Sequence, residues 1–336
     1  MKWLYKIALV FLIAVVASSA AMAVYYFSMI NKVYGGSTAN AFGVNPKYHF
    51  SLIINSGDDE YWQNFEKGVF DAGKAFNAAI EYNPISDPDS VDKTVEYINI
   101  ANKSRVDGII VNGGNSAEYS DAINSAAKSG IHIVVGIVES VDSNRLSYVG
   151  TNFYDFGMKA AKLISQAVDK HTPINLAVIL SDSNQGKNDK TVMSQSDIMM
   201  SGITSMIESE QKINLLGTLH RNSDLLGAED LTRSILTEHP DVDVIFCTSA
   251  KDTAAAARVI VERNLVGKVA IVGTGITDEI KYYIRKGIVF GVLDRNGYNA
   301  GYKSVDILCG SVGDSFQSSY LNIATDIYTA INIDYK

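Results

Sequence analysis

The sequence predicts two α/β lobes, each a parallel sheet flanked by helices, preceded by one N-terminal transmembrane helix. Three observations support this fold class. The 336 residues are 47% hydrophobic, which is enough for two units of about 100–200 residues each. From Tyr48 onward, short apolar runs alternate with longer amphipathic ones. A long uncharged stretch lies close to the N-terminus.

That uncharged stretch, residues 7–30, is the predicted membrane anchor, because about 20 apolar residues cross the hydrocarbon core. Lys2 and Lys6 precede it, so the positive-inside rule leaves the N-terminus in the cytoplasm and the remainder outside. A cleaved signal peptide is the alternative, since residues 21–23 (AMA) have the form of a cleavage site. The apolar run continues past that site, which favours the uncleaved anchor.

The remaining elements alternate between strand and helix along the chain. The strands are continuous apolar runs, a pattern typical of parallel sheets that are covered on both faces. In the first half, strands are expected at 50–54, 78–82, 108–111, 131–138 and 148–150, with helices at 63–76, 91–102 and 116–129. In the second half, strands are expected at 176–180, 213–219, 244–247, 269–272 and 289–293, with helices at 155–168, 196–209, 227–238, 253–264 and 278–285.

Polar residues follow nearly every predicted strand, where open α/β sheets bind their ligands. Tyr61 and Trp62 offer flat apolar faces beside Asp59, which suits the C–H faces and hydroxyl rim of a sugar. A purely structural interpretation makes Asp58 or Asp59 a helix cap and Trp62 a core residue. The predicted ligand-binding residues are Asp59, Tyr61, Trp62, Asn115, Glu139, Asn184, Asn222, Asp252, Thr274, Asp294, Arg295 and Asn296.

Other classes of function find little support. The net charge is −8 with no basic cluster, which argues against nucleic-acid binding. No GxSxG elbow, phosphate-binding loop or GxGxxG motif is present, so neither an enzyme nor a cofactor is predicted. No metal site is predicted either, since CxxC and HExxH are missing. Cys247 and Cys309 lie in apolar surroundings and are expected to be buried free thiols, although a disulfide between them stays possible.

Four segments carry more specific motifs: Val106–Val111 (VDGIIV), Tyr148–Asn152 (YVGTN), His239–Phe246 (HPDVDVIF) and Val292–Tyr302 (VLDRNGYNAGY). Together they resemble the type I periplasmic binding proteins of the ribose- and xylose-binding group, from about Tyr48 to the C-terminus. The resemblance implies a two-lobed periplasmic-binding-protein type I fold whose lobes close on the ligand about a hinge. It implies an anchor or signal peptide over 1–33, a linker over 34–47, one lobe from 48–152 and 296–324, and the other from 153–295 and 325–336.

The family's ribose-contacting residues are not retained. Met199 stands where the family has an arginine, Gly275 where it has an aspartate, and Arg295 where it has a glutamine. The resemblance to the group as a whole implies a small sugar as the ligand, with a pentose, D-xylose, as the expected one.

An anchor joined to such a domain resembles the membrane-anchored xylose-binding sensor proteins that partner a LytS-type histidine kinase. This resemblance implies a single-pass protein of the cell membrane with its binding domain outside the cytoplasm. Closure on the sugar would signal to the histidine kinase of a two-component system. The alternative is the substrate-binding protein of a sugar ABC importer, whose partner is a permease. A sugar-responsive DNA-binding repressor shares the lobes, but this chain has an apolar segment where that family has its helix-turn-helix.

Overall fold

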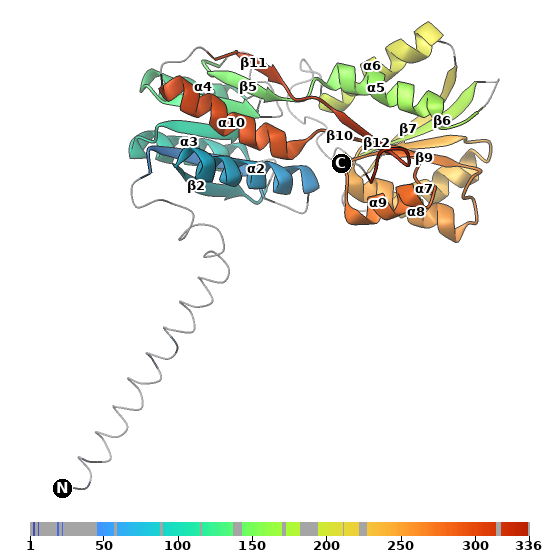
Figure 1. Ribbon diagram of the computed structural model, residues 1–336, viewed down its shortest axis with the longest axis horizontal. Helices are drawn as coiled ribbons and strands as arrows, with labels where there is room; N and C mark the ends of the chain where they lie inside the picture. The colour runs from blue at the N-terminus through green and yellow to red at the C-terminus, as the bar shows by residue number, and fades with distance from the viewer. Residues whose placement is uncertain are drawn as a thin grey trace.

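The computed structural model (Figure 1) contains two α/β lobes joined side by side. Apart from residues 3, 6, 19 and 22, the residues that the structure describes are 46–56, 59–87, 90–114, 116–136, 143–169, 173–181, 194–210, 212–221, 227–313 and 317–334. Within these ranges no helix qualifies as a membrane span. Apart from residues 19 and 22, the predicted anchor at 7–30 lies outside the described residues, and so does nearly all of the linker at 34–47.

The first lobe is built on a six-stranded sheet in the order β11-β5-β4-β3-β1-β2, and all of its strand pairs are parallel. Its strands are β1 (Tyr48–Asn55), β2 (Ala78–Ile85), β3 (Gly108–Asn112), β4 (His132–Gly136), β5 (Ser147–Gly150) and β11 (Tyr320–Asn322). Its helices are α2 (Glu60–Phe76), α3 (Val91–Ser104), α4 (Ala117–Lys128) and α10 (Gly297–Val312).

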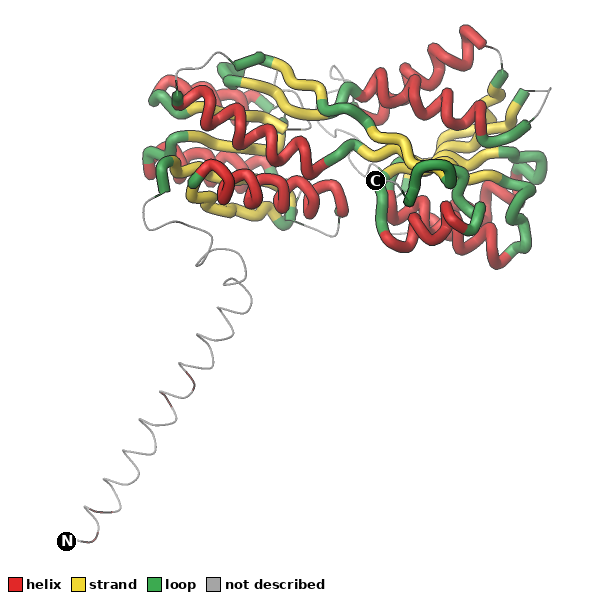
Figure 2. The backbone as a smooth tube through the Cα atoms, viewed as in Figure 1, coloured by secondary structure: helices red, strands yellow, loops and turns green. Residues whose placement is uncertain are grey.

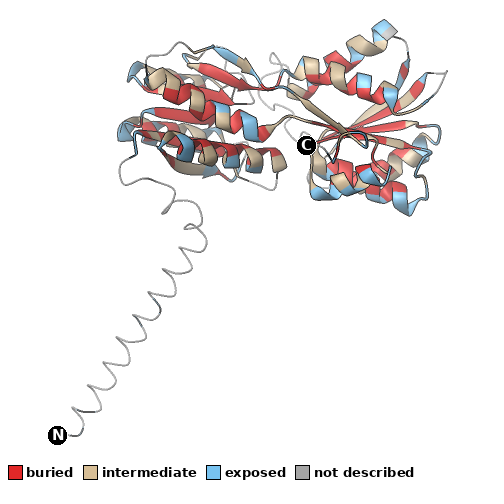
Figure 3. Ribbon diagram, viewed as in Figure 1, coloured by how far each residue is buried: buried red, intermediate tan, exposed pale blue. Residues whose placement is uncertain are grey.

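The side chains of successive residues in β1 point to opposite faces of this sheet, as the twofold repeat of a strand requires. Leu52 packs with Phe65 of α2 and Leu308 of α10 in one core cluster. Ile53 packs with Ile98 of α3 in another cluster on the opposite face. Because both faces are covered, the four central strands β1, β3, β4 and β5 are buried almost throughout, which Figure 3 shows as red ribbon.

The second lobe repeats this plan with the strand order β12-β10-β9-β8-β6-β7. Helices α5 and α6 cover one face of the sheet, and α7, α8 and α9 cover the other. Its strands are β6 (Ile174–Leu180), β7 (Ile213–His220), β8 (Val244–Cys247), β9 (Ala270–Thr274), β10 (Gly291–Asp294) and β12 (Asp326–Thr329). Its helices are α5 (Phe153–Gln166), α6 (Gln195–Glu210), α7 (Ala228–Glu238), α8 (Ala250–Glu262) and α9 (Asp278–Arg285).

The predicted parallel sheets are present in both lobes, but one strand of the second lobe departs from the pattern, because β12 runs antiparallel to β10. The reason lies in the route of the chain. The parallel strands β5 and β10 both end where the chain leaves one lobe for the other. A strand that enters the second lobe from that edge, as β12 does after β11, must therefore run in the opposite direction.

The chain crosses between the lobes three times, after β5, after β10 and after β11 (Figure 2). Side chains tie the three crossings together. The backbone N–H of Asn152 donates to Asn322 Oδ1 at 3.0 Å, and Asn296 Nδ2 donates to Asp326 Oδ2 at 3.1 Å. Asn296 has a φ of 55°, a left-handed conformation that asparagine tolerates better than most residues. These three crossings are the segments that join the two lobes.

In each lobe, glycines let two helices cross with their backbones in contact. A Cβ atom at Gly68 of α2 would lie 2.0 Å from the carbonyl oxygen of Tyr298 in α10. A Cβ atom at Gly157 of α5 would lie 2.0 Å from the carbonyl oxygen of Met199 in α6. The two lobes therefore repeat the same close crossing, in each case with a helix that directly follows an interlobe crossing.

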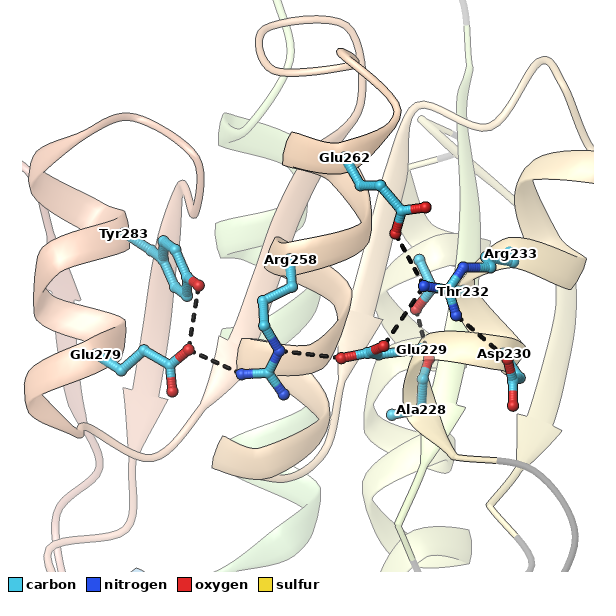
Figure 4. A network of polar contacts seen from close by, with 9 residues as sticks. All are labelled: Ala228, Glu229, Asp230, Thr232, Arg233, Arg258, Glu262, Glu279 and Tyr283. Carbon is cyan, nitrogen blue, oxygen red and sulfur yellow. Dashed lines mark hydrogen bonds and ion pairs between the residues drawn. The ribbon is translucent and has the colours of Figure 1, made fainter.

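Charged side chains link the three helices on one face of the second lobe (Figure 4). Arg258 of α8 lies between Glu229 of α7, with Nε to Oε1 at 3.0 Å, and Glu279 of α9, with Nη1 to Oε1 at 2.8 Å. Arg233 of α7 pairs with Glu262 of α8 at 2.8 Å. All of these side chains are at least one-third exposed, so each pair is screened by solvent and contributes little stability by itself.

Replacing Arg258 by glutamine should lower the free energy of unfolding by about 1 kcal/mol at low salt, since two exposed ion pairs are lost together. The difference from wild type should shrink in about 1 M salt, where charges are screened within about 3 Å. Chemical denaturation at both salt concentrations measures this. Arg263→Gln is the matched control, because exposed Arg263 forms no ion pair with any described residue. A salt-independent loss in Arg258→Gln would contradict the electrostatic explanation.

Candidate functional site

The carboxyl ends of the parallel strands in each lobe face the other lobe, because β5 and β10 lead from those ends into the crossings. This is the edge at which open α/β sheets bind ligands. Two surface hollows, of about 630 and 600 Å³, lie instead at the amino ends of the strands. Neither hollow is lined by a buried polar atom that lacks a partner. The interlobe edge is therefore the better candidate.

In the first lobe, Asp59 caps helix α2. Its Oδ1 atom accepts a hydrogen bond from the Tyr61 backbone N–H at 2.8 Å, the usual role of aspartate before the first helical turn. Asp59 is exposed. Its cap explains why α2 begins at Glu60, earlier than the apolar spacing predicted.

Tyr61 and Trp62 lie at the start of α2 and pack into the core of the first lobe. Their exposed fractions are 8% and 9%, and their rings meet edge to face with centroids 5.6 Å apart. The Arg295 guanidinium, from the second crossing, lies 4.3 Å from the centroid of the Tyr61 ring. Burial raises the pKa of Tyr61 to about 12. The two aromatics are therefore part of the packed core at the end of this lobe that lies nearest the second crossing.

In the second lobe, Asp252 occupies the first turn of α8 and is 1% exposed. Its Oδ1 atom lies 3.0 Å from Nε of Arg221, which follows β7 directly. Burial raises the pKa of Asp252, while the positive charge of Arg221 opposes the rise. Thr274, at the end of β9, is also buried, and its backbone N–H donates to Thr253 Oγ1 at 3.4 Å.

The predicted residues Asp294, Arg295 and Asn296 all belong to the second crossing. Burial raises the pKa of Asp294, whereas hydrogen bonds from the backbone amides of Asn296 and Arg295 lower it. Asn296 caps α10, with Oδ1 accepting from Asn299 N at 3.3 Å. The structure thus brings these three together with Tyr61 at the hinge.

Three buried side-chain oxygens near this interlobe edge have no hydrogen-bond partner within the described part of the chain: Glu60 Oε2, Asn112 Oδ1 and Asp252 Oδ2. An unsatisfied buried polar atom costs about 1–3 kcal/mol and calls for an explanation. Asn112 ends β3 and Glu60 begins α2 in one lobe, while Asp252 begins α8 in the other. A ligand with several hydroxyl groups between the lobes would supply the missing partners.

The structure adds Glu60, Asn112 and Arg221 to the residues predicted from sequence. Asn112 is the last residue of its strand, and Arg221 is the first residue after its strand. A polar residue at the end of a predicted strand is therefore the sequence signal that could have identified these two. Four other predicted residues, Asn115, Glu139, Asn184 and Asn222, lie outside the described residues.

Cys247 and Cys309 are free and buried, which confirms the prediction of free thiols. Burial raises the pKa of Cys309 to about 11, so its thiol is protonated at neutral pH. Among the residues that the structure describes, no group of three or more His, Cys, Asp or Glu side chains is placed to hold a metal ion.

Comparisons with known proteins agree with this architecture. Residues 50–312 match the family described as periplasmic binding protein domain. The D-allose-binding periplasmic protein of Escherichia coli K12 is 20% identical over 268 residues, covering 77% of this chain and 83% of that protein. Among solved structures, GanP, a glucose-galactose binding protein from Geobacillus stearothermophilus, is 25% identical, with a TM-score of 0.72, over 85% of this chain and 98% of GanP. The XylFII–LytSN complex contains a chain that is 25% identical, with a TM-score of 0.70, over 84% of this chain and 98% of that one.

Proposed function

Because this chain belongs to the periplasmic binding protein domain family, we propose that it binds a small sugar between its two lobes, outside the cytoplasm. The observation that carries this proposal is the set of unpartnered buried oxygens at the interlobe edge, contributed by both lobes. Its relatives are sugar-binding proteins rather than enzymes, in line with the sequence, which carries no catalytic motif.

The chemistry of these groups suits a neutral polyhydroxylated ligand. The carboxylate oxygen of Asp252 and the amide oxygen of Asn112 accept hydrogen bonds, and sugar hydroxyls donate them. Hydrogen bonds to charged acceptors are worth about 1.5–3 kcal/mol each, so a few of them orient a small ligand. We propose a pentose, D-xylose, on the sequence resemblance to the ribose- and xylose-binding group.

Ligand capture would proceed by rotation of the lobes about the three crossings. A sugar that touches both strand-end edges binds the closed arrangement more tightly than the open one, and so shifts the population toward it. The hydrogen bonds between Asn152 and Asn322 and between Asn296 and Asp326 keep the crossings together during that rotation.

For the partner, we propose a membrane histidine kinase of the LytS type. The uncharged segment at 7–30 and the similarity to XylFII in its complex with LytSN support this role. An ABC importer is the second candidate, favoured by the cleavage-site pattern at residues 21–23. N-terminal sequencing of the mature protein separates the two, because a start near Val24 favours transport and an intact Met1 favours the anchored sensor.

Isothermal titration calorimetry with a panel of pentoses, hexoses and inositols tests the binding function. We expect one sugar of the panel, D-xylose, to bind with a dissociation constant of about 1 μM, which corresponds to about −8 kcal/mol. If no sugar in the panel produces heat of binding with correctly folded protein, the proposed function is wrong. If a hexose binds and D-xylose does not, only the choice of sugar is wrong.

A further inference from the structure

Glu60 connects the two lobes directly, although it was not among the residues predicted from sequence. It stands at the first position of α2 in the first lobe. The backbone amide of Ile276, in the loop between β9 and α9 of the second lobe, lies close enough to its carboxylate to favour the ionised form. A Cβ atom at neighbouring Gly275 would lie only 3.5 Å from Glu60 Oε2. The Glu60 carboxylate therefore lies beside this loop of the second lobe.

The surroundings of the Glu60 carboxyl group disfavour its ionised form. The side chain is partly buried between the lobes, and Oε2 has no hydrogen-bond partner among the described residues. Asp59 on the same lobe and Asp294 at the end of β10 are negative groups near it. Lys281 of α9 and the Ile276 amide are the groups that favour the ionised form. Burial, with the two aspartates next, raises the pKa of Glu60 to about 7 from an ordinary value of 4.5.

We propose that Glu60 is a proton-sensitive latch between the lobes, which favours the closed arrangement when its carboxyl group is neutral and disfavours it when ionised. The latch rests on the proposed function, since closure is what would retain the sugar. No proton has to move to the ligand. The proton comes from solvent and stays on the Glu60 carboxyl group while the lobes are together.

The direction of the effect follows from linkage between proton binding and closure. In an open arrangement Glu60 is hydrated at the exposed end of α2 and should titrate near its ordinary value. With Glu60 beside the second lobe, as in this structure, its pKa is about 7, so an arrangement that keeps this contact binds the proton more tightly than one that breaks it. Closure is therefore favoured as the pH falls through about 7, and the full preference is present below about 4.5.

The test uses the full-length protein and D-xylose as the probe, with calorimetric titrations at about pH 5.5 and about pH 8. Affinity should be roughly tenfold higher at the lower pH, because closure is then coupled to proton uptake. Glu60→Gln keeps an oxygen for the Ile276 amide and is always neutral. The affinity of this variant should be the same at the two pH values, whatever its absolute level, because the side chain has no proton to gain or lose in this range.

Glu66→Gln is the matched control. Burial also raises the pKa of Glu66, but its hydrogen-bond partner is Tyr82 of the same lobe, so opening and closing leave its surroundings unchanged. The pH dependence of wild type should persist in Glu66→Gln. If Glu60→Gln shows the same pH dependence as wild type, the latch is refuted.

A measurement without sugar separates this proposal from the proposed function. Ile100→Cys on α3 and Val261→Cys on α8 place one exposed label site in each lobe, while Cys247 and Cys309 are buried. Electron–electron distance measurements on the spin-labelled full chain should show a larger short-distance population at about pH 5.5 than at about pH 8. Adding Glu60→Gln should abolish that difference. A pH-independent distance distribution overturns the latch, whereas a working latch with no sugar bound overturns only the sugar-binding proposal.

Discussion

Replacing Gly68 by alanine should destabilise the first lobe by about 3 kcal/mol, at the upper end of what overpacking usually costs. The new Cβ would lie 2.0 Å from the backbone oxygen of Tyr298, and a backbone atom cannot move aside as a flexible side chain would. Helices α2 and α10 would have to separate. The better helix propensity of alanine, worth about 1 kcal/mol, offsets only part of this cost.

Chemical denaturation followed by circular dichroism measures the effect. Gly217→Ala in β7 is the control, because a Cβ there meets no atom within 4 Å, and its stability should stay close to wild type. A Gly68→Ala variant as stable as Gly217→Ala would show that the crossing tolerates a methyl group and that the backbone contact is looser than described.

Replacing Asp252 by asparagine should weaken sugar binding by about tenfold to a hundredfold, since a charge-assisted hydrogen bond is worth about 1.5–3 kcal/mol. Asp252 is 1% exposed, its Oδ2 atom lacks a partner among the described residues, and Arg221 holds its other oxygen. Asparagine keeps the size of the side chain but loses the negative charge on the oxygen that would accept a hydrogen bond from a sugar hydroxyl. Calorimetric titration with D-xylose near neutral pH measures the loss.

Asp121→Asn, at an exposed position of α4, makes the same chemical change away from the interlobe edge and should leave affinity unchanged. Thermal unfolding of Asp252→Asn must show a cooperative transition, so that a loss of affinity reports on the site and not on folding. Unchanged affinity in a folded Asp252→Asn protein would remove this residue from the site.

Most of the fold was predictable because the buried strands appear in the sequence as continuous apolar runs. The predicted bounds of β8 (Val244–Cys247) and α9 (Asp278–Arg285) agree with the structure. Helix α8 begins at Ala250, earlier than predicted, because Ser249 caps it and its side chain accepts from Asp252 N. Capping residues therefore extended helices into segments that the apolar spacing had assigned to loops.

The end of the chain was not assigned by the pattern of apolar residues. Helix α10 buries a stripe that includes Gly301 and Ser304, so its inner face carries a weak hydrophobic signal. Strands β11 and β12 are three and four residues long, with no fully buried position. The direction of β12 depends on where the third crossing enters the second lobe, which is a property of the whole topology.

The site was predicted in outline, because its residues follow strands, but sequence could not separate ligand contacts from structural roles. Tyr61 and Trp62 are core residues of the first lobe, and Asp59 is a helix cap. In a sequence, an aromatic residue or a carboxylate before a helix looks the same whether it contacts a ligand or has a structural role. Glu60 stands out only in three dimensions, because it lies beside the loop between β9 and α9. The pairing of Arg221 with the buried carboxylate of Asp252 is likewise visible only in the structure.

A crystal structure of the protein with bound D-xylose tests most directly where the ligand is held. The sugar should lie between the carboxyl ends of the two sheets, with its hydroxyl groups within hydrogen-bond distance of Asp252 Oδ2 in one lobe and Asn112 Oδ1 in the other. A sugar at the amino ends of the strands, or one that leaves both of these oxygens unpartnered, would contradict the interlobe site.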